Sequence, residues 1–279
     1  MSNTAKEILN NRQIIIGAAI ILFLVIVAAL APFMRIHDPY QLNLSPEQRL
    51  QPPSKEHPFG TDDLGRDVFS RMVYGARISL FVGLIAVSIA LLIGVTLGAL
   101  AGYFGGWVDA LVMRIVEMMM CIPTIYLILM IIAFLGPSII YIMVVIGLTS
   151  WMGLTRLVRS EFLSLREREY VIAARALGAS DLRIIFRHLL PNALTPVFPN
   201  VTLKLGGAIL LESTLSFLGL GVQVPTPSWG NIISTGRFYI DSAWWLTLLP
   251  GLAILITVLS FYLIGDGLRT VLDPRLKQL

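Results

Sequence analysis

The sequence predicts an all-α polytopic membrane protein with six transmembrane helices. Hydrophobic residues make up 56% of its 279 residues and charged residues 14%, whereas soluble domains carry about 25% charged residues. The mean hydropathy is +0.79, and the apolar residues gather in runs long enough for membrane helices of about 20 residues. Basic residues cluster at the ends of these runs, which argues against nucleic acid as a partner despite the net charge of +4.

The first predicted span covers residues 14–34, which carry no charge, and residues 1–13 form the segment before it. A cleaved signal peptide is the alternative, because Ala29 and Ala31 resemble a cleavage site. The apolar part exceeds the usual core of about 7–15 residues, and Pro32 follows the small residues. An uncleaved span is therefore favoured.

Residues 35–77 form an external loop that is rich in proline and polar residues. Its last part predicts a turn followed by a helix from about Val68, and acids near that start suit the helix dipole. We expect the loop to contact an external binding protein or to fix the entry into the second span. The residues that indicate the turn are Gly60, Asp62, Asp63, Gly65, Arg66 and Asp67.

Five further spans follow in the remaining apolar runs. Residues 78–108 form the second span. Residues 118–155 contain no charge and are long enough for two helices, with a turn at Gly136-Pro137-Ser138. Residues 192–220, which prolines interrupt, form the fifth span, and residues 242–265 form the sixth.

Arginines concentrate between the fourth and fifth spans, in a loop at residues 156–191. Because basic residues favour the cytoplasmic side, this loop and both termini are predicted to face the cytoplasm. The plan is thus a membrane domain at 78–265 and a cytoplasmic carboxyl-terminal segment at 266–279. Trp244 and Trp245 fit an interfacial aromatic anchor. The arginines of the loop are Arg156, Arg159, Arg166, Arg168, Arg175, Arg183 and Arg187.

The end of this loop, "EYVIAARALGASDLRIIFRHLLP" at 169–191, predicts two short amphipathic helices. One apolar stripe at helical spacing comprises Leu182, Ile185, Phe186 and Leu189, and an upstream stripe comprises Tyr170, Ala173, Ala174 and Leu177. Gly178 suits the left-handed residue between helices, Ser180 suits a cap, and Pro191 is expected to end the second helix. The pair either rests on lipid headgroups or docks into a partner's groove.

The segment resembles the coupling loop of ABC importer permeases, whose pattern is Glu-Ala-Ala, three residues, Gly, nine residues, Ile, one residue, Leu-Pro. Ile172 replaces the acid of the pattern, and His188 replaces its isoleucine. Five residues fall at matching positions: Ala173, Ala174, Gly178, Leu190 and Pro191. The resemblance implies that these five contact an ATPase, together with Ala179, Ser180 and Asp181.

Three other stretches resemble the dipeptide, oligopeptide and nickel branch of these permeases, in particular its second, shorter-looped subunit. They are "FGTDDLGRDVFSRMVYGARISL" at 59–80, "LSFLGLGVQVPTPSWG" at 215–230 and "GDGLRTVLDPRLK" at 265–277. The resemblance implies the architecture of a type I ABC importer permease in a prokaryotic cytoplasmic (inner) membrane. It implies binding-protein-dependent import of dipeptides or oligopeptides, with nickel or another small solute as the alternative.

The resemblance also implies partners: a second, different permease subunit, two cytoplasmic ATPases, an external substrate-binding protein and the lipid bilayer. The chain contains no G-x-x-x-x-G-K-[ST] phosphate loop. ATP is therefore expected on the ATPase partners, and no cofactor or catalytic residue is expected on this chain. Closure of the paired ATPases is expected to move the coupling loop and switch the attached spans between inward-facing and outward-facing states.

Glu212 lies inside the fifth span, and an ionisable residue at such a place indicates function. It either lines the translocation path or forms a buried hydrogen bond to another helix or to the partner permease. Gly94, Gly98 and Gly102 repeat every four residues in the second span and favour close helix packing.

Other function classes fit the sequence less well. An ion-driven secondary transporter is expected to carry inverted repeats and charges near the membrane centre, and the halves show neither clearly. A membrane hydrolase is disfavoured because H-E-x-x-H and G-x-S-x-G are absent. His37, His57 and His188 form no evident cluster along the sequence, so no metal site is expected.

Overall fold

A computed structural model describes residues 3–34 and 37–272 of the chain. Parts of three predicted segments lie outside the described residues: 1–2 of the amino-terminal segment, 35–36 of the external loop and 273–279 of the carboxyl-terminal segment. Within the described ranges the elements are helices, and the one β contact is an isolated bridge between Thr61 and Asp67.

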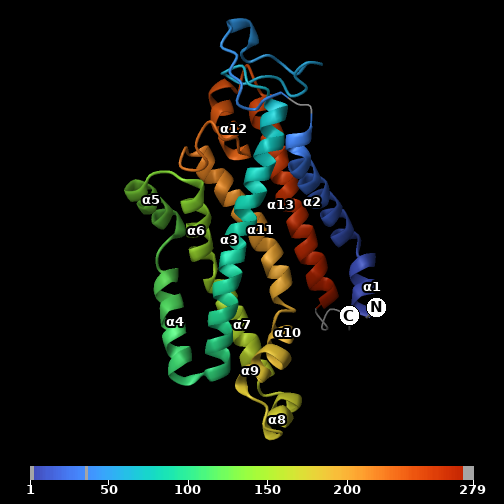
Figure 1. Cartoon of the computed structure of the whole chain (residues 1–279), viewed down its shortest axis with the longest axis vertical. Coiled ribbons are helices and arrows are strands. Elements are labelled where there is room, and N and C mark those ends of the chain that lie inside the picture. The colour runs from blue at the N-terminus through green and yellow to red at the C-terminus, as the bar shows by residue number, and fades with distance from the viewer. Residues whose placement is uncertain (1–2, 35–36, 273–279) are drawn as a thin grey trace.

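The long helices lie side by side (Figure 1), with α3 packed against α7, α6 and α11, and α13 packed against α2 and α11. The predicted external loop and α12 lie at one end of this bundle, and α8 lies at the opposite end. The helices are α1 (Asn3–Asn10), α2 (Arg12–Leu30), η1 (Ala31–Phe33), η2 (Pro46–Gln48), α3 (Val68–Phe104), α4 (Gly106–Met120), α5 (Thr124–Leu135), α6 (Ile139–Ser150), α7 (Met152–Leu165), α8 (Glu169–Ala176), α9 (Asp181–Arg183), the π-helical η3 (Ile184–Leu189), α10 (Leu190–Ala193), α11 (Val197–Phe217), α12 (Trp229–Gly236), η4 (Arg237–Tyr239) and α13 (Trp245–Leu272).

Six candidate spans are present when each bent helix pair counts as one, in agreement with the predicted number. Four are single helical stretches: α2 with η1, α3, α6 with α7, and α13. The other two are bent, by 76° between α4 and α5 and by 63° between the helices of 181–193 and α11. The fifth predicted span, 192–220, thus corresponds to α11 and the bend before it.

The helix predicted from about Val68 is confirmed, since α3 begins there, ahead of the uncharged run. Asp67 caps it, because its Oδ2 accepts hydrogen bonds from the Ser70 backbone N–H at 2.7 Å and from the Ser70 hydroxyl at 2.6 Å. Arg71 is buried in the first turn, where its Nε lies 3.5 Å from Asp62. Because its charge lies beside Asp62, Arg71 can be buried at the start of this span.

The run at 118–155 differs in part from its prediction. The turn at 136–138 is confirmed, because α5 ends before it and α6 begins after it. The preceding span is not one straight helix, since the chain also bends between α4 and α5 at Pro123. Pro123 has an extended backbone with ψ at 128°, and its missing N–H cannot continue the helical hydrogen bonds of α4.

The predicted close packing along the glycine repeat is confirmed between α3 and α7. A Cβ atom at Gly98 would lie 2.7 Å from the carbonyl oxygen of Thr155, and one at Gly102 would lie 2.5 Å from the Cβ of Phe162. No side chain fits at these positions without moving one helix. Because α7 leads directly to α8, this contact joins the end of the bundle to the predicted coupling loop.

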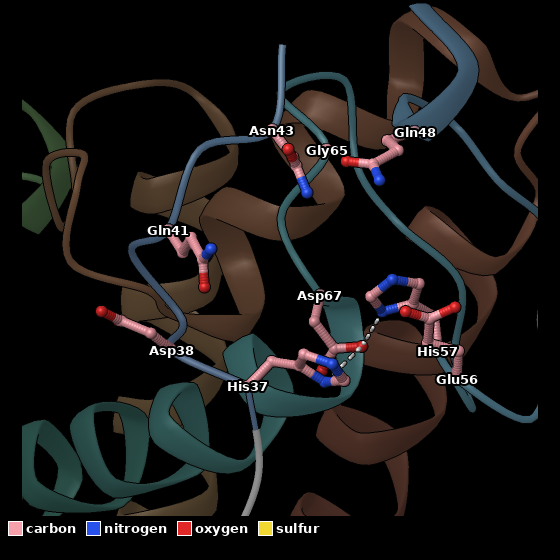
Figure 2. A pocket seen from close by; sticks show the side chains of 9 residues that line it. All are labelled: His37, Asp38, Gln41, Asn43, Gln48, Glu56, His57, Gly65 and Asp67. Carbon is pink, nitrogen blue, oxygen red and sulfur yellow. Dashed lines mark hydrogen bonds and ion pairs between the residues drawn. The ribbon is translucent and has the colours of Figure 1, made fainter. Parts of the chain in front are cut away.

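The structure corrects two predictions at the end of the bundle where the predicted external loop lies. His37 and His57 do come together, with ring centroids 4.8 Å apart beside Asp67 (Figure 2), because the loop folds back on the start of α3. Of the two tryptophans predicted as an interfacial anchor, Trp244 is exposed but Trp245 is buried, and the Trp245 indole N–H donates to the Thr61 carbonyl oxygen at 3.1 Å. Both the histidine cluster and the burial of Trp245 result from contacts between residues that are far apart in the sequence.

Candidate functional site

The predicted coupling segment forms a compact end of the molecule, here called the tip and comprising residues 166–193. It contains α8, α9, η3 and α10, and it projects beyond the long helices at the end opposite the external loop (Figure 1). Helix α7 enters the tip, and α11 leaves it after a bend. The tip therefore connects the α6–α7 span to the span that contains α11.

A glycine bend joins the two parts of the tip, as predicted. Gly178 has φ at +80°, and its N–H donates to the Arg175 carbonyl oxygen at 3.0 Å. The next N–H, from Ala179, donates to the Ala174 carbonyl oxygen at 3.1 Å, which completes a Schellman end to α8. Nothing lies within 4 Å of a Cβ built at Gly178, so backbone conformation alone calls for glycine there.

The second part of the tip departs from the predicted ideal helix. Ser180 occupies the cap position but its side chain makes no capping hydrogen bond. Pro191 does not end the helix, which continues to Ala193. The reason is the π-helical turn η3: the Leu190 N–H donates to the Ile185 carbonyl oxygen, and Pro191 follows in the first turn of α10, where a missing N–H is tolerated.

The predicted apolar stripe of this part is also wrong in detail. Ile184, Ile185 and Leu189 are buried, whereas Leu182 and Phe186 are 68% and 63% exposed. The π-helical turn has more residues per turn than an α-helix, so a spacing of 3.6 residues assigns the wrong side chains to the buried face.

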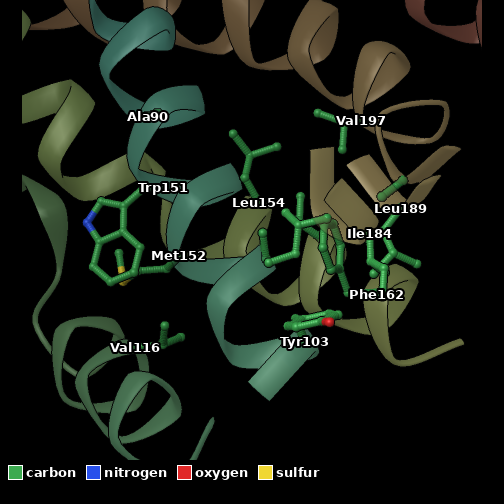
Figure 3. Close-up of a cluster of buried hydrophobic side chains, with 14 of the residues drawn as sticks. Ala90, Tyr103, Val116, Trp151, Met152, Leu154, Phe162, Ile184, Leu189 and Val197 are labelled. Atoms are coloured by element: carbon green, nitrogen blue, oxygen red, sulfur yellow. The ribbon is translucent and has the colours of Figure 1, made fainter. Parts of the chain in front are cut away.

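The buried face of the tip packs into a hydrophobic cluster that includes the ends of α3 and α7. Ile184 and Leu189 are fully buried there, together with Phe162 of α7 (Figure 3). Tyr103, near the end of α3, lies in the same cluster, and Val171 anchors α8 to it. Apolar burial therefore joins both halves of the tip to the two helices that pack along the glycine repeat.

Polar contacts add to this attachment. The Tyr103 hydroxyl donates to Asp181 Oδ1 at 2.5 Å, at the start of the second half of the tip. The Arg166 guanidinium donates to the Gly102 carbonyl oxygen at 3.3 Å. Arg159 of α7 also forms a bidentate ion pair with Asp109 of α4, which attaches the α4–α5 span to α7.

The opposite face of the tip exposes apolar side chains. Leu177, at the bend, is 89% exposed. We call this surface the tip patch, and its members are Tyr170, Ile172, Leu177, Leu182 and Phe186. They come from both sides of the bend, and Arg175, Arg183 and Arg187 of the same segment are also exposed. The surface therefore suits an apolar groove with an acidic rim.

The predicted ATPase-contacting residues lie together on the tip, partly or fully accessible to solvent. Pro191 lies farther along the tip, in α10. The exposed members are Ala173, Gly178, Ser180, Asp181 and Pro191, and the half-buried members are Ala174, Ala179 and Leu190.

Tyr103 was not predicted as part of this site, because a lone tyrosine at the end of a span gives no sign of contact with a residue 78 positions away. The role of the predicted contact residues stays a prediction.

Glu212 lies in the interior of the bundle and is fully buried. Its Oε1 accepts from the Ser216 hydroxyl at 2.7 Å, and its Oε2 accepts from the Ser79 hydroxyl of α3 at 3.1 Å. This arrangement matches the interhelical hydrogen bond expected as one of its two roles. Its role in a translocation path stays a prediction.

Comparisons with known proteins give consistent matches. Residues 94–278 match the family described as binding-protein-dependent transport system inner membrane component, and residues 3–53 match the N-terminal TM domain of oligopeptide transport permease C. The dipeptide transport system permease protein DppC of Alkalihalophilus pseudofirmus is 47% identical over 98% of this chain and 89% of that relative. The probable D,D-dipeptide transport system permease protein DdpC of Escherichia coli is 42% identical over 93% of this chain and 86% of that relative.

One solved structure shows the fold. The inward-facing MetNI methionine ABC transporter matches with a TM-score of 0.58 and 22% identity, over 73% of this chain and 97% of that chain.

Proposed function

This chain belongs to the family of binding-protein-dependent transport system inner membrane components, and on that basis we propose that it is the permease subunit of an ATP-driven importer for dipeptides or oligopeptides. The predicted resemblance to ABC importer permeases is confirmed, as is the all-α polytopic architecture. The protein is therefore a multi-pass subunit of the inner membrane.

The relatives support the proposed cargo. Three relatives at 42–47% identity are described as permeases for dipeptides or peptides, and each match covers 98% of this chain. The amino-terminal match to oligopeptide transport permease C extends the similarity to the first span. In the proposed cycle an external binding protein delivers the peptide, and a second permease subunit completes the path with this chain.

The exposed tip patch is the observation that carries the proposed mechanism. Apolar side chains at a projecting end are unfavourable in water unless a partner or lipid covers them. Here they flank the Gly178 bend, within the segment that resembles a coupling loop. We assign them to a groove on a separate cytoplasmic ATPase, one for each permease subunit. ATP-driven closure of the two ATPases then moves the tip.

Motion of the tip reaches the membrane through rigid contacts. The buried face of the tip, the Tyr103–Asp181 hydrogen bond and the close α3–α7 packing connect it to the bundle. Packed interfaces of this kind transmit a displacement because they have little free volume to absorb it. The tip faces the cytoplasm in this proposal, in line with its arginines, and the external loop faces the binding protein.

Cysteine cross-linking tests this assignment. The single cysteine, Cys121, is first replaced by serine, and Leu182→Cys is then introduced and co-expressed with candidate ATPase and permease subunits from the same organism. Cross-linking to the ATPase is expected at position 182, with a yield that changes between ATP-bound and nucleotide-free states. Leu92→Cys, an exposed position in α3, is the control and is expected to stay unlinked.

Two results would contradict the proposal. One is labelling of Leu182→Cys by an impermeant reagent added from outside the cell. The other is a cross-link to the ATPase that is no stronger at position 182 than at position 92. Uptake of labelled dipeptide by the assembled complex, without uptake by this chain alone, tests the cargo separately.

A further inference from the structure

Two histidines and an aspartate meet at the external end, where the sequence suggested no cluster. His57 Nδ1 lies 2.9 Å from Asp67 Oδ1, and His37 Nδ1 lies 4.0 Å from the same oxygen. Both rings point toward this carboxylate (Figure 2). One ligand atom from each of the three residues lies within 4.8 Å of the others.

Two of the three side chains are held in place by other contacts. Asp67 is almost fully buried, and its second oxygen, Oδ2, is already bound to Ser70 at the start of α3. The backbone of His57 is fixed by hydrogen bonds with Ser54 and with the Gly60 N–H. Oδ1 of Asp67 and the ring of His57 are therefore preorganised, whereas the half-exposed His37 is free to adjust.

A cavity of about 200 Å³ opens beside these residues. Its lining includes Asp38, Glu56 and Asp67 besides the two histidines, and no lysine or arginine among the described residues contributes to it. The surplus of negative charge attracts cations. The polar lining also leaves room for water or for a further oxygen ligand.

A hydrogen bond alone accounts for only half of this arrangement. His57 is at hydrogen-bonding distance from Asp67, but His37 at 4.0 Å from the same oxygen is not. A metal ion accounts for all three groups, because Zn²⁺ takes two imidazoles, a carboxylate and water in a tetrahedral site. Bonds of about 2.0–2.1 Å to such an ion put its ligands about 3.3 Å apart. This spacing lies between the 2.9 Å and 4.0 Å that separate Asp67 Oδ1 from the two imidazole nitrogens.

We propose that His37, His57 and Asp67 form a binding site for a divalent transition-metal ion, with Zn²⁺ as the reference ion. Imidazole ligands favour such ions over Mg²⁺ and Ca²⁺, which prefer oxygen ligands. The ion would join three parts of the external end: the segment after α2, the loop at residue 57 and the cap of α3. It would thereby clamp the external loop onto the entry of the second span.

Metal titration of the purified full-length protein in detergent micelles tests the site. The apo protein is prepared with a chelator, and Zn²⁺ is then titrated in competition with a chromophoric chelator. One Zn²⁺ per chain is expected, and His37→Ala and His57→Ala are each expected to weaken binding at least about tenfold. Asp67 is left unchanged because it also caps α3.

The third histidine provides a matched control, since the chain contains only three. His188→Ala, at the tip, is expected to bind Zn²⁺ as the unaltered protein does. Co²⁺ serves as a second probe, with visible absorption that the double variant His37→Ala/His57→Ala lacks. The clamp predicts that Zn²⁺, and not Mg²⁺, raises the melting temperature of the protein in a concentration-dependent manner.

Unchanged Zn²⁺ affinity and stoichiometry in the double variant would overturn the proposal. So would the absence of Zn²⁺ binding to the unaltered protein at micromolar free metal. Loss of binding in His188→Ala to the same extent as in the other variants would assign the metal elsewhere and equally reject this site. None of these outcomes depends on transport activity, so they are separate from the test of the proposed function.

Discussion

Substitution of Gly178 tests whether the bend of the tip is what the transport mechanism requires. The position has φ at +80° and nothing within 4 Å of a built Cβ, so a new side chain meets no neighbour. The free energy that the substitution costs is therefore that of the backbone conformation alone. Gly178→Ala, Gly178→Val and Gly178→Asn differ in that cost while the space around them stays the same.

The left-handed conformation costs an L-residue about 1–2 kcal/mol relative to glycine, which corresponds to a factor of roughly 5 to 30 in the population of the bent tip. Asparagine tolerates this region better than alanine, and β-branched valine tolerates it worst. The expected order of function is thus glycine, asparagine, alanine, valine. The bundle is expected to fold in all variants, because the buried face of the tip is unchanged.

The assay measures peptide uptake and ATP hydrolysis in the reconstituted complex, as the ratio of peptide transported to ATP hydrolysed. This ratio is expected to fall in the stated order, and hydrogen exchange at residues 169–193 is expected to rise in the same order. Gly207→Val is the control, because Gly207 also has an open surrounding but lies at ordinary helical φ in α11.

Full coupling in Gly178→Val would refute the reasoning, because the bend would then not be needed. Equal losses in Gly178→Asn and Gly178→Val would also refute it, since backbone conformation would not be the cause. A loss of the same size in Gly207→Val would point to a general effect of added bulk.

Two further predictions concern the bundle. Gly98→Leu is expected to lower the melting temperature strongly, because the α3–α7 contact has no room for a Cβ. Overpacking of this kind costs about 1–3 kcal/mol or more. A melting temperature equal to that of Gly207→Leu would contradict this prediction. Glu212→Ala is expected to destabilise by about 2–5 kcal/mol, since it leaves buried hydroxyls without their acceptor and opens a cavity, whereas Glu212→Gln costs less. Lost uptake with unchanged stability in Glu212→Gln would instead favour a role in the translocation path.

Several features of the fold were predictable because they depend on local sequence. The number of spans follows from the length and hydropathy of the runs, and the turn at 136–138 follows from its glycine and proline. The start of α3 at Val68 follows from an aspartate at the cap, and the bend at Gly178 follows from a glycine between two helical patterns. Each of these signals lies within a few residues of the feature it determines.

Other features were missed because a local pattern did not contain them. The predicted stripe is divided between buried and exposed residues, because a π-helical turn follows Arg183 and a 3.6-residue period does not anticipate it. The bend at Pro123 lies inside a continuous apolar run, where length alone suggested an unbroken helix. Burial of Trp245 depends on its hydrogen bond to the external loop, far away in the sequence.

The sequence by itself determined that this chain is a multi-pass membrane protein and which segment resembles a coupling loop, because hydropathy and turn residues act over short distances. Only the tertiary structure decided which side chains of the tip face outward and which residues of α3 hold it. Only that structure, too, brought His37 and His57 together at Asp67. These outcomes depend on the return of distant segments to the same place, and no spacing along the chain encodes such a return.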